Sequence, residues 1–217
     1  MEQDILTENQ RAVIREVAAA PELRGFYLSG GTALAAYYLK HRLSDDLDFF
    51  SAENPDPIFL RAFAETVKSS VGATAVRFQR LYERNQFFFM LPGDELKVEF
   101  TRYPFSQLEK LSEHDGIKID SLRDIAANKL AALLDRFDPK DFVDLYFLLQ
   151  KFDLTHIRTD TEKKFGALID PLFLGGELAK ARRIAALPKM ILPLAIAELQ
   201  KFYADLAQTL TPSIFSD

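Results

Sequence analysis

One stretch, residues 26–50, constrains this chain more than any other. It runs from an apolar segment through Gly30-Gly31, a short amphipathic segment and a polar turn to an apolar segment that carries Asp46 and Asp48. This pattern predicts strand, glycine turn, helix and strand. Because side chains alternate along a strand, Asp46 and Asp48 share one face, roughly 6.5–7 Å apart, and Leu47 points into the core.

The aspartate pair indicates a bound cation. Two carboxylates on one face of an apolar strand repel each other and lose hydration, and a divalent cation between them relieves both costs. The alternative is a turn residue beside a surface acid, although Leu47 and the Phe49-Phe50 pair favour a buried strand. Asp45 is out of register with the pair and reads as a turn acid.

The glycine pair indicates an anion. Gly30 and Gly31 stand just before an expected helix start, where free backbone N–H groups attract a phosphate. His41 and Arg42, between that helix and the aspartates, are further candidates for phosphate contact, or a basic pair favoured by the helix dipole. A phosphate cradle followed by metal-binding carboxylates predicts phosphoryl or nucleotidyl transfer.

A third acid is expected on a separate strand. Residues 95–103 alternate cleanly, with Leu96, Val98 and Phe100 on one face and Glu99 with Lys97 on the other. Two-metal phosphoryl-transfer sites draw carboxylates from more than one element, which makes Glu99 a candidate. The alternative is a solvated face on which Lys97 pairs with an acid.

Charged residues also interrupt the apolar stripes of two later helices. Lys129 lies on the row of Ile125 and Leu133, where a lysine either snorkels to solvent or is held over a phosphate. Asp144 stands in mid-helix among apolar neighbours, and Asp141 follows a helix start. Either acid is a candidate base for an incoming hydroxyl, or a group that orients Lys129 or Arg136.

Composition narrows the classes of protein to which the chain can belong. The chain has 217 residues, enough for one large domain or two small ones, and it has no cysteine, which excludes disulfides and thiolate chemistry. Its net charge of −5 argues against a surface coated for non-specific nucleic-acid binding. We expect no signal peptide, no membrane-spanning segment and a cytoplasmic location.

The order of the elements predicts an α+β fold in two parts. Residues 1–120 read as a small mixed sheet covered by helices, and residues 121–217 read as a helical domain that completes the nucleotide site. In the second part, helices are expected over about 121–135, 139–150, 160–169, 176–186 and 191–208.

With these residues in place, the sequence resembles the AbiEii/AbiGii-type nucleotidyltransferase toxins of type IV toxin–antitoxin systems, within the DNA polymerase β-like nucleotidyltransferase superfamily. The segments that carry the resemblance are residues 30–34, 41–50, 97–100, 124–130 and 140–145. Members of this family are often longer than this chain.

The resemblance implies a set of roles. Gly30, Gly31 and Thr32 cradle the triphosphate, and Arg42 and Ser44 belong to the same nucleotide-binding set. Asp46 and Asp48 bind Mg²⁺, with two ions during catalysis and Mn²⁺ as an alternative, and Glu99 is the third metal ligand.

In the helical part, the resemblance makes Lys129 a nucleotide-phosphate contact and assigns Asp141 and Asp144 to the late catalytic motif. It also implies transfer of a nucleotide from an NTP, in some members onto tRNA, and a cognate antitoxin. The alternative is a non-catalytic member of the same fold that binds a nucleotide or a protein.

Overall fold

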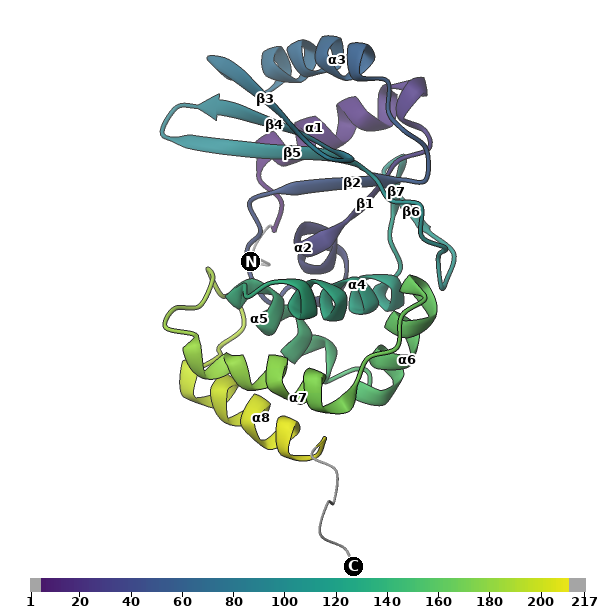
Figure 1. Cartoon of the computed structure of the whole chain (residues 1–217). Coiled ribbons are helices and arrows are strands. Elements are labelled where there is room, and N and C mark those ends of the chain that lie inside the picture. Colours follow the sequence, from purple (N-terminus) through teal and green to yellow (C-terminus); the bar gives the residue numbers. More distant parts are fainter. Residues whose placement is uncertain (1–4, 211–217) are drawn as a thin grey trace, which may run out of the picture. The chain divides into compact units, whose positions relative to one another are not determined.

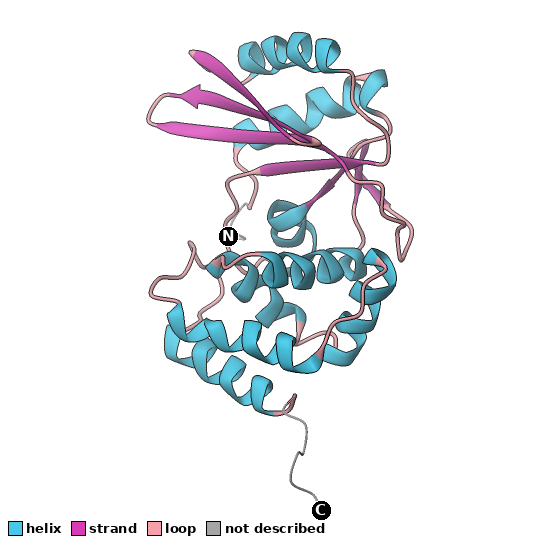
Figure 2. Ribbon diagram, in the orientation of Figure 1, coloured by secondary structure: helices cyan, strands magenta, loops and turns pink. Residues whose placement is uncertain are grey.

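The structure is a computed structural model that describes residues 5–210. It divides after Leu122 into two compact units, residues 1–122 and 123–217. Figure 1 labels the elements and Figure 2 distinguishes helices from strands. The first unit holds a mixed sheet with helices and the second unit is built from helices, so the predicted α+β fold is confirmed.

The sheet of the first unit has seven strands in the order β3-β4-β5-β2-β1-β7-β6. Strand β2 pairs in parallel with β5, and β1 in parallel with β7, whereas the other neighbours are antiparallel. The strands are β1 (Tyr27–Ser29), β2 (Leu47–Ser51), β3 (Ala75–Leu81), β4 (Arg84–Leu91), β5 (Asp94–Arg102), β6 (Ser112–His114) and β7 (Ile117–Ile119).

Within residues 5–122, three α-helices accompany the sheet. Helices α1 (Glu8–Ala19) and α3 (Pro57–Ser70) lie on one side of it, and α2 (Gly30–Ala33) lies on the other side (Figure 1). Helix α2 continues as a π-helix, η2 (Leu34–Leu39), and a short 3₁₀ helix, η1 (Pro21–Leu23), follows α1.

The face of the sheet beneath α1 and α3 is an aromatic core. Phe100 is 1% exposed and its ring contacts four other phenylalanine rings, three of them edge-on, at centroid distances of 5.2–6.3 Å. These rings belong to Phe26, Phe49, Phe63 and Phe87. Because side chains along β2, β5 and β4 alternate, Asp48, Glu99 and Gln86 lie on the opposite face of the sheet from Phe49, Phe100 and Phe87.

The second unit contains α4 (Leu122–Asp135), α5 (Pro139–Leu148), α6 (Leu154–Phe165), α7 (Pro171–Leu178), η3 (Ala179–Arg183) and α8 (Ile196–Gln208). Helix α5 begins as expected, with Asp138 accepting a hydrogen bond from the Lys140 N–H and Pro139 at the first helical position. Helix α8 packs against α7 and η3. Within residues 5–210, no helix combines the length and the apolarity needed to cross a membrane.

Several boundaries differ from the prediction. Strands β6 and β7 were not expected, because three-residue strands around the Asp115-Gly116 turn are too short to show alternation. Helix α6 begins at Leu154, earlier than the expected residue 160, since Asp153 caps it ahead of a polar segment with little apolar periodicity. Helices α7 and α8 also differ from the expected ranges at their first residues.

Replacing Phe100 tests this core. We expect Phe100→Ala to lower the free energy of unfolding by about 3–5 kcal/mol, since the variant loses buried apolar area and leaves a cavity among four rings. Ile58→Ala, at a side chain that is 81% exposed, is the control and should change stability by less than about 0.5 kcal/mol. Urea unfolding measures both, and equal losses would contradict the assigned core.

Candidate functional site

The two aspartates lie at the start of β2. Asp48 is in the strand, whereas Asp46 immediately precedes it, so the strand starts one residue later than predicted. Asp48 is the Cα partner of Ser29 on one side and of Glu99 on the other. The Asp46 side chain is 43% exposed, and its Oδ2 lies 4.0 Å from Nζ of Lys97, so this carboxylate is partly open and pairs with a lysine of β5.

The glycine turn lies directly against Asp48. Gly30 has a φ of +71°, and a Cβ at this position would lie 2.5 Å from Oδ2 of Asp48. Only glycine therefore combines this backbone conformation with the close approach of the carboxylate. The first predicted phosphate-binding residue and one predicted metal ligand are thus in contact in the structure.

The other predicted nucleotide-binding residues build the same turn. The guanidinium of Arg42 occupies the space that a Cβ on Gly31 would need, and Oγ of Ser44 lies 3.2 Å from that position. The Thr32 hydroxyl donates a hydrogen bond to the carbonyl oxygen of Asp46. Arg42 is 1% exposed and its Nη1 donates to the Leu43 carbonyl oxygen at 2.9 Å. These contacts join the glycine turn to the segment that carries the aspartates.

Glu99 lies beside Asp48 but is surrounded by donors. Its Oε1 accepts from Arg84 Nε at 2.5 Å and from the Thr101 hydroxyl at 2.7 Å. Its Oε2 accepts from Arg84 Nη2 at 2.9 Å and from Gln86 Nε2 at 2.8 Å, and Lys97 Nζ lies 3.2 Å away. Burial by itself raises the pKa of Glu99, but hydrogen bonds from Arg84 and Gln86 and the charges of Arg84 and Lys97 outweigh it and hold the pKa at about 2.

The carboxylates differ in how well they suit a metal ion. Asp46 and Asp48 carry the carboxylate oxygens that Mg²⁺ prefers, and Asp46 is partly exposed, but their metal role remains a prediction. Both oxygens of Glu99 already accept hydrogen bonds, so a metal bound there would displace donors. Across residues 5–210, no cluster of three or more acidic or histidine side chains is arranged to hold a metal. The metal role of Glu99 stays a prediction.

In the second unit, Lys129 lies between two acids. Its Nζ is 2.6 Å from Oδ2 of Asp144 and 3.0 Å from Oδ1 of Asp141, and Arg136 donates to the other oxygen of Asp141 at 3.2 Å. The Lys129 side chain is only 11% exposed. The ammonium is therefore held between α4 and α5 and does not extend into solvent, and both acids have the orienting contact that was one of their expected roles.

Tyr203 of helix α8 holds α5, the helix that carries Asp141 and Asp144, in place. The Tyr203 hydroxyl donates to the Phe142 carbonyl oxygen at 2.7 Å, and the two rings meet edge-on. Burial raises the pKa of Tyr203 well above its usual value, and the negative charges of Asp144 and Asp141 raise it further. The tyrosine therefore stays neutral and acts as a hydrogen-bond donor that holds α5.

Sequence reasoning missed several residues around the aspartates. Asp120 is fully buried and accepts a hydrogen bond at 2.7 Å from the hydroxyl of Ser29, the residue just before the glycine turn. Arg84 and Gln86, which bind Glu99, were also missed. The pairing of β4 with β5 creates the contacts to Glu99, and the pairing of β1 with β7 brings Asp120 near Ser29. Periodicity shows which face a residue occupies but not which strand lies beside it.

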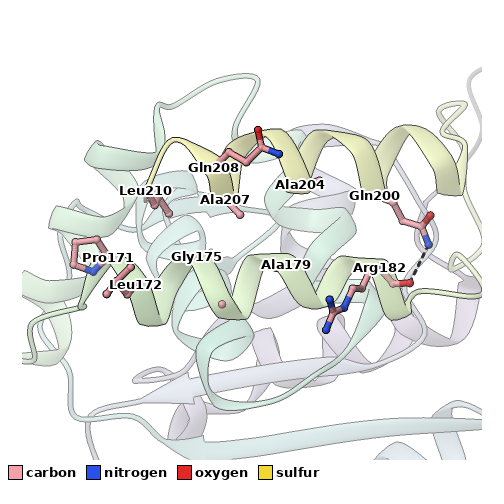
Figure 3. Close-up of a pocket in the computed structure, with 11 residues that line it drawn as sticks. Pro171, Leu172, Gly175, Ala179, Arg182, Gln200, Ala204, Ala207, Gln208 and Leu210 are labelled. Carbon is pink, nitrogen blue, oxygen red and sulfur yellow. Dashed lines mark hydrogen bonds between the residues drawn. The ribbon is translucent and has the colours of Figure 1, made fainter. Parts of the chain in front are cut away.

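A cavity of about 410 Å³ lies elsewhere in the second unit, between α8 and the α7–η3 segment (Figure 3). Small residues form much of its wall: Gly175, Gly176, Ala179, Ala204 and Ala207. None of the predicted site residues lines it. The chemistry inferred from the sequence therefore does not involve this cavity.

Comparison with known proteins now decides the family. Residues 12–212 match the family described as "Nucleotidyl transferase AbiEii toxin, Type IV TA system". The chain belongs to this family. The resemblance seen in short segments of the sequence is therefore confirmed over most of the length of the chain.

The chain is also similar to individual proteins. An uncharacterized protein of Aquifex aeolicus is 33% identical over 164 residues, which cover 74% of this chain and 76% of that protein. A putative nucleotidyltransferase from Helicobacter pylori superposes with a TM-score of 0.60 at 21% identity, covering 94% of this chain and 96% of the other. MenT4, a nucleotidyltransferase toxin from Mycobacterium tuberculosis, superposes with a TM-score of 0.58 at 17% identity, covering 94% of this chain and 82% of the other. At these identities, the two structures show a shared fold.

Alanine at Gly30 tests the contact with Asp48. Gly30→Ala should destabilise the protein by more than the roughly 1–2 kcal/mol that a positive φ costs, because the Asp48 side chain must also move. Gly72→Ala is a matched control, since Gly72 has a φ of +65° and no atom within 4 Å of a Cβ. Denaturant unfolding gives both values, and equal costs would show that the contact is absent.

The low pKa of Glu99 predicts how stability depends on pH. A lowered pKa stabilises the fold above the ordinary value of 4.5, and this stabilisation is lost as the pH falls towards about 2. Wild type should lose roughly a few kcal/mol of unfolding free energy on acidification, and Glu99→Gln should not show this loss. Unfolding measured between about pH 6 and pH 2 should therefore show a difference from wild type that shrinks in acid. Glu95→Gln, an exposed position on the same strand, controls for the change in residue type.

Proposed function

We propose that this protein transfers a nucleotide from a nucleoside triphosphate to an acceptor hydroxyl, with tRNA or another RNA as the acceptor. One observation carries the proposal: the Asp48 carboxylate lies against the Gly30 turn, so the metal-binding and phosphate-binding groups expected for this chemistry are in contact. Family membership supports nucleotidyl transfer as the reaction type.

Asp46 and Asp48 would hold Mg²⁺ or Mn²⁺, which supplies charge neutralisation for the triphosphate and activation of the acceptor hydroxyl. The backbone N–H groups at Gly30 and Gly31 bind the departing phosphates. The turn keeps its shape because Arg42 packs on Gly31 and Thr32 bonds to the Asp46 carbonyl. Its geometry therefore exists before the substrate binds.

Lys129 contributes a fixed positive charge that contacts a phosphate of the nucleotide. Asp144 and Asp141 hold its ammonium from two sides, so little side-chain entropy is lost when a phosphate binds. Asp141 and Asp144 thus act through Lys129, as positioning residues.

We extend the proposal to the biological role. The family description names a toxin of a type IV toxin–antitoxin system, and this chain would be such a toxin with a cognate antitoxin. With nucleoside triphosphates and RNA as substrates, the reaction would take place in the cytoplasm. Expression with and without a neighbouring candidate antitoxin gene, followed by growth measurement, tests this role.

The decisive experiment uses α-labelled nucleoside triphosphates, Mg²⁺ and total tRNA. Wild type should transfer label to RNA, and Asp46→Ala should reduce the rate by at least about 100-fold, because the charge on the triphosphate is no longer neutralised. Asp45→Ala is the matched control, since Asp45 is the adjacent acid and its side chain is exposed. This variant should retain wild-type activity.

Three results would contradict the proposal. Transfer of γ-label in place of α-label would identify a phosphoryl transferase. Metal-dependent binding of the nucleotide in a calorimeter, with no turnover on any acceptor, would identify a binding protein. Equal activity of Asp46→Ala and Asp45→Ala would show that the aspartate pair does not serve the reaction.

A further inference from the structure

The polar face of the sheet continues past Asp48 with two partly exposed cations around the buried Glu99. Adjacent Cα partners form a row from Ser29 through Asp48 and Glu99 to Gln86. Next to Glu99 on this face lie two cations, Lys97 on the same strand and Arg84 on β4. We call Arg84, Lys97, Gln86 and Glu99 the β4–β5 cluster.

Burial within the β4–β5 cluster is uneven. The Glu99 side chain is 2% exposed, whereas that of Arg84 is 39% exposed and that of Lys97 is 21% exposed. The carboxylate is thus the buried centre and the two cations reach solvent. Glu99 binds Arg84 through Nε and Nη2, which leaves Nη1 for an external acceptor.

The geometry of the Glu99–Arg84 ion pair indicates that it positions the Arg84 guanidinium as well as stabilising the fold. A guanidinium held at two nitrogens by one carboxylate keeps its plane fixed, and its free edge matches the oxygens of a phosphate. Gln86 and Thr101 hold the carboxylate in turn, at 2.8 Å and 2.7 Å. The cluster therefore holds the Arg84 guanidinium in a set direction beside Asp48, and Lys97 lies between Glu99 at 3.2 Å and Asp46 at 4.0 Å.

Strand order shows which substrate this charge faces. The glycine turn follows β1, on one side of β2, and the β4–β5 cluster lies on the other side of β2. In phosphoryl-type transfer the attacking and leaving oxygens are roughly in line, on opposite sides of the phosphorus. If the leaving phosphates bind the Gly30-Gly31 turn, the acceptor enters from the side of β5 and β4.

We propose that Arg84 and Lys97, positioned by Glu99, bind backbone phosphates of the RNA acceptor. This inference rests on the proposed function and adds to it the surface that receives the acceptor. It also gives Glu99 a positioning role in place of the third metal ligand expected from the sequence. Farther along the same face, the guanidinium of Arg77 lies 3.8 Å from the centre of the Phe88 ring and extends the basic surface to β3.

Binding of labelled total tRNA without nucleotide tests the surface. Arg84→Ala and Lys97→Ala should each weaken binding several-fold, and each should reduce the slope of log affinity against log salt by about one. Arg80→Ala is the matched control, because Arg80 is an exposed arginine of β3 whose register with Asn85 places it on the opposite face. Affinities of Arg84→Ala and Lys97→Ala equal to that of Arg80→Ala would overturn the proposal.

Measuring nucleotide binding distinguishes cations that bind the acceptor RNA from cations that bind the triphosphate. Calorimetry with a non-hydrolysable nucleoside triphosphate and Mg²⁺ should give the same affinity for wild type and Arg84→Ala; Lys97→Ala is left out of this comparison because Lys97 lies 4.0 Å from Asp46. A loss of nucleotide affinity in Arg84→Ala with RNA affinity unchanged would place this cation on the triphosphate and overturn the proposal.

Measuring Mn²⁺ binding distinguishes whether Glu99 positions the neighbouring cations or binds the metal ion. By electron paramagnetic resonance, Glu99→Gln should bind Mn²⁺ like wild type, whereas Asp46→Ala should bind it weakly. Glu99→Gln should also raise the KM for tRNA more than it lowers kcat. Loss of Mn²⁺ binding in folded Glu99→Gln would overturn the positioning role, and if this variant does not fold, the two cation variants decide.

The two proposals fail in different ways. Absence of nucleotide transfer by wild type would refute the proposed function, whereas the RNA-binding comparison needs no turnover. If wild type transfers nucleotide and Arg84→Ala binds and uses tRNA normally, the acceptor surface is wrong and the proposed function stands.

Discussion

The register between β2 and β5 sets the electrostatics of the first unit. It places the carboxyl-bearing residues Asp48 and Glu99 side by side on one face of the sheet, above an aromatic core on the other. Neighbouring acids at the edge of a low-dielectric core repel each other unless cations approach. Arg84 and Lys97 neutralise Glu99, and the close approach of Gly30 leaves Asp48 facing the turn. The division of roles between the two acids follows from these neighbours.

In the second unit the charges are the reverse of those around Glu99, because a nearly buried cation lies between acids. Lys129 is nearly buried, and Asp141 and Asp144 supply the negative charge that keeps its ammonium stable there. A second buried pair, Lys164 with Asp124 at 2.6 Å, joins α6 to α4. Breaking either pair would leave an uncompensated buried charge, so these helices are held in register by charge as well as by packing.

Much of the local structure could be predicted from the sequence. Asp56-Pro57 and Asp138-Pro139 begin helices as their cap chemistry requires. Alternation along residues 95–103 correctly put Phe100 and Glu99 on opposite faces of the sheet, although both side chains are buried. The prediction failed for β6 and β7, and for the start of α6, where the elements are short or polar and periodicity is weak. It also missed Arg84 and Asp120, whose importance comes from strands and side chains distant in the sequence.

The sequence by itself determined the residue types, the alternation that separates the polar face from the core, and the order of segments that resembles the family. Those properties are local, since they depend on spacing along the chain. Only the tertiary structure decided that Glu99 is saturated with donors, that Lys129 lies between two acids, and that Asp48 contacts Gly30. The physical reason is that hydrogen bonds and ion pairs depend on which strands and helices become neighbours, and that pairing is a property of the whole fold.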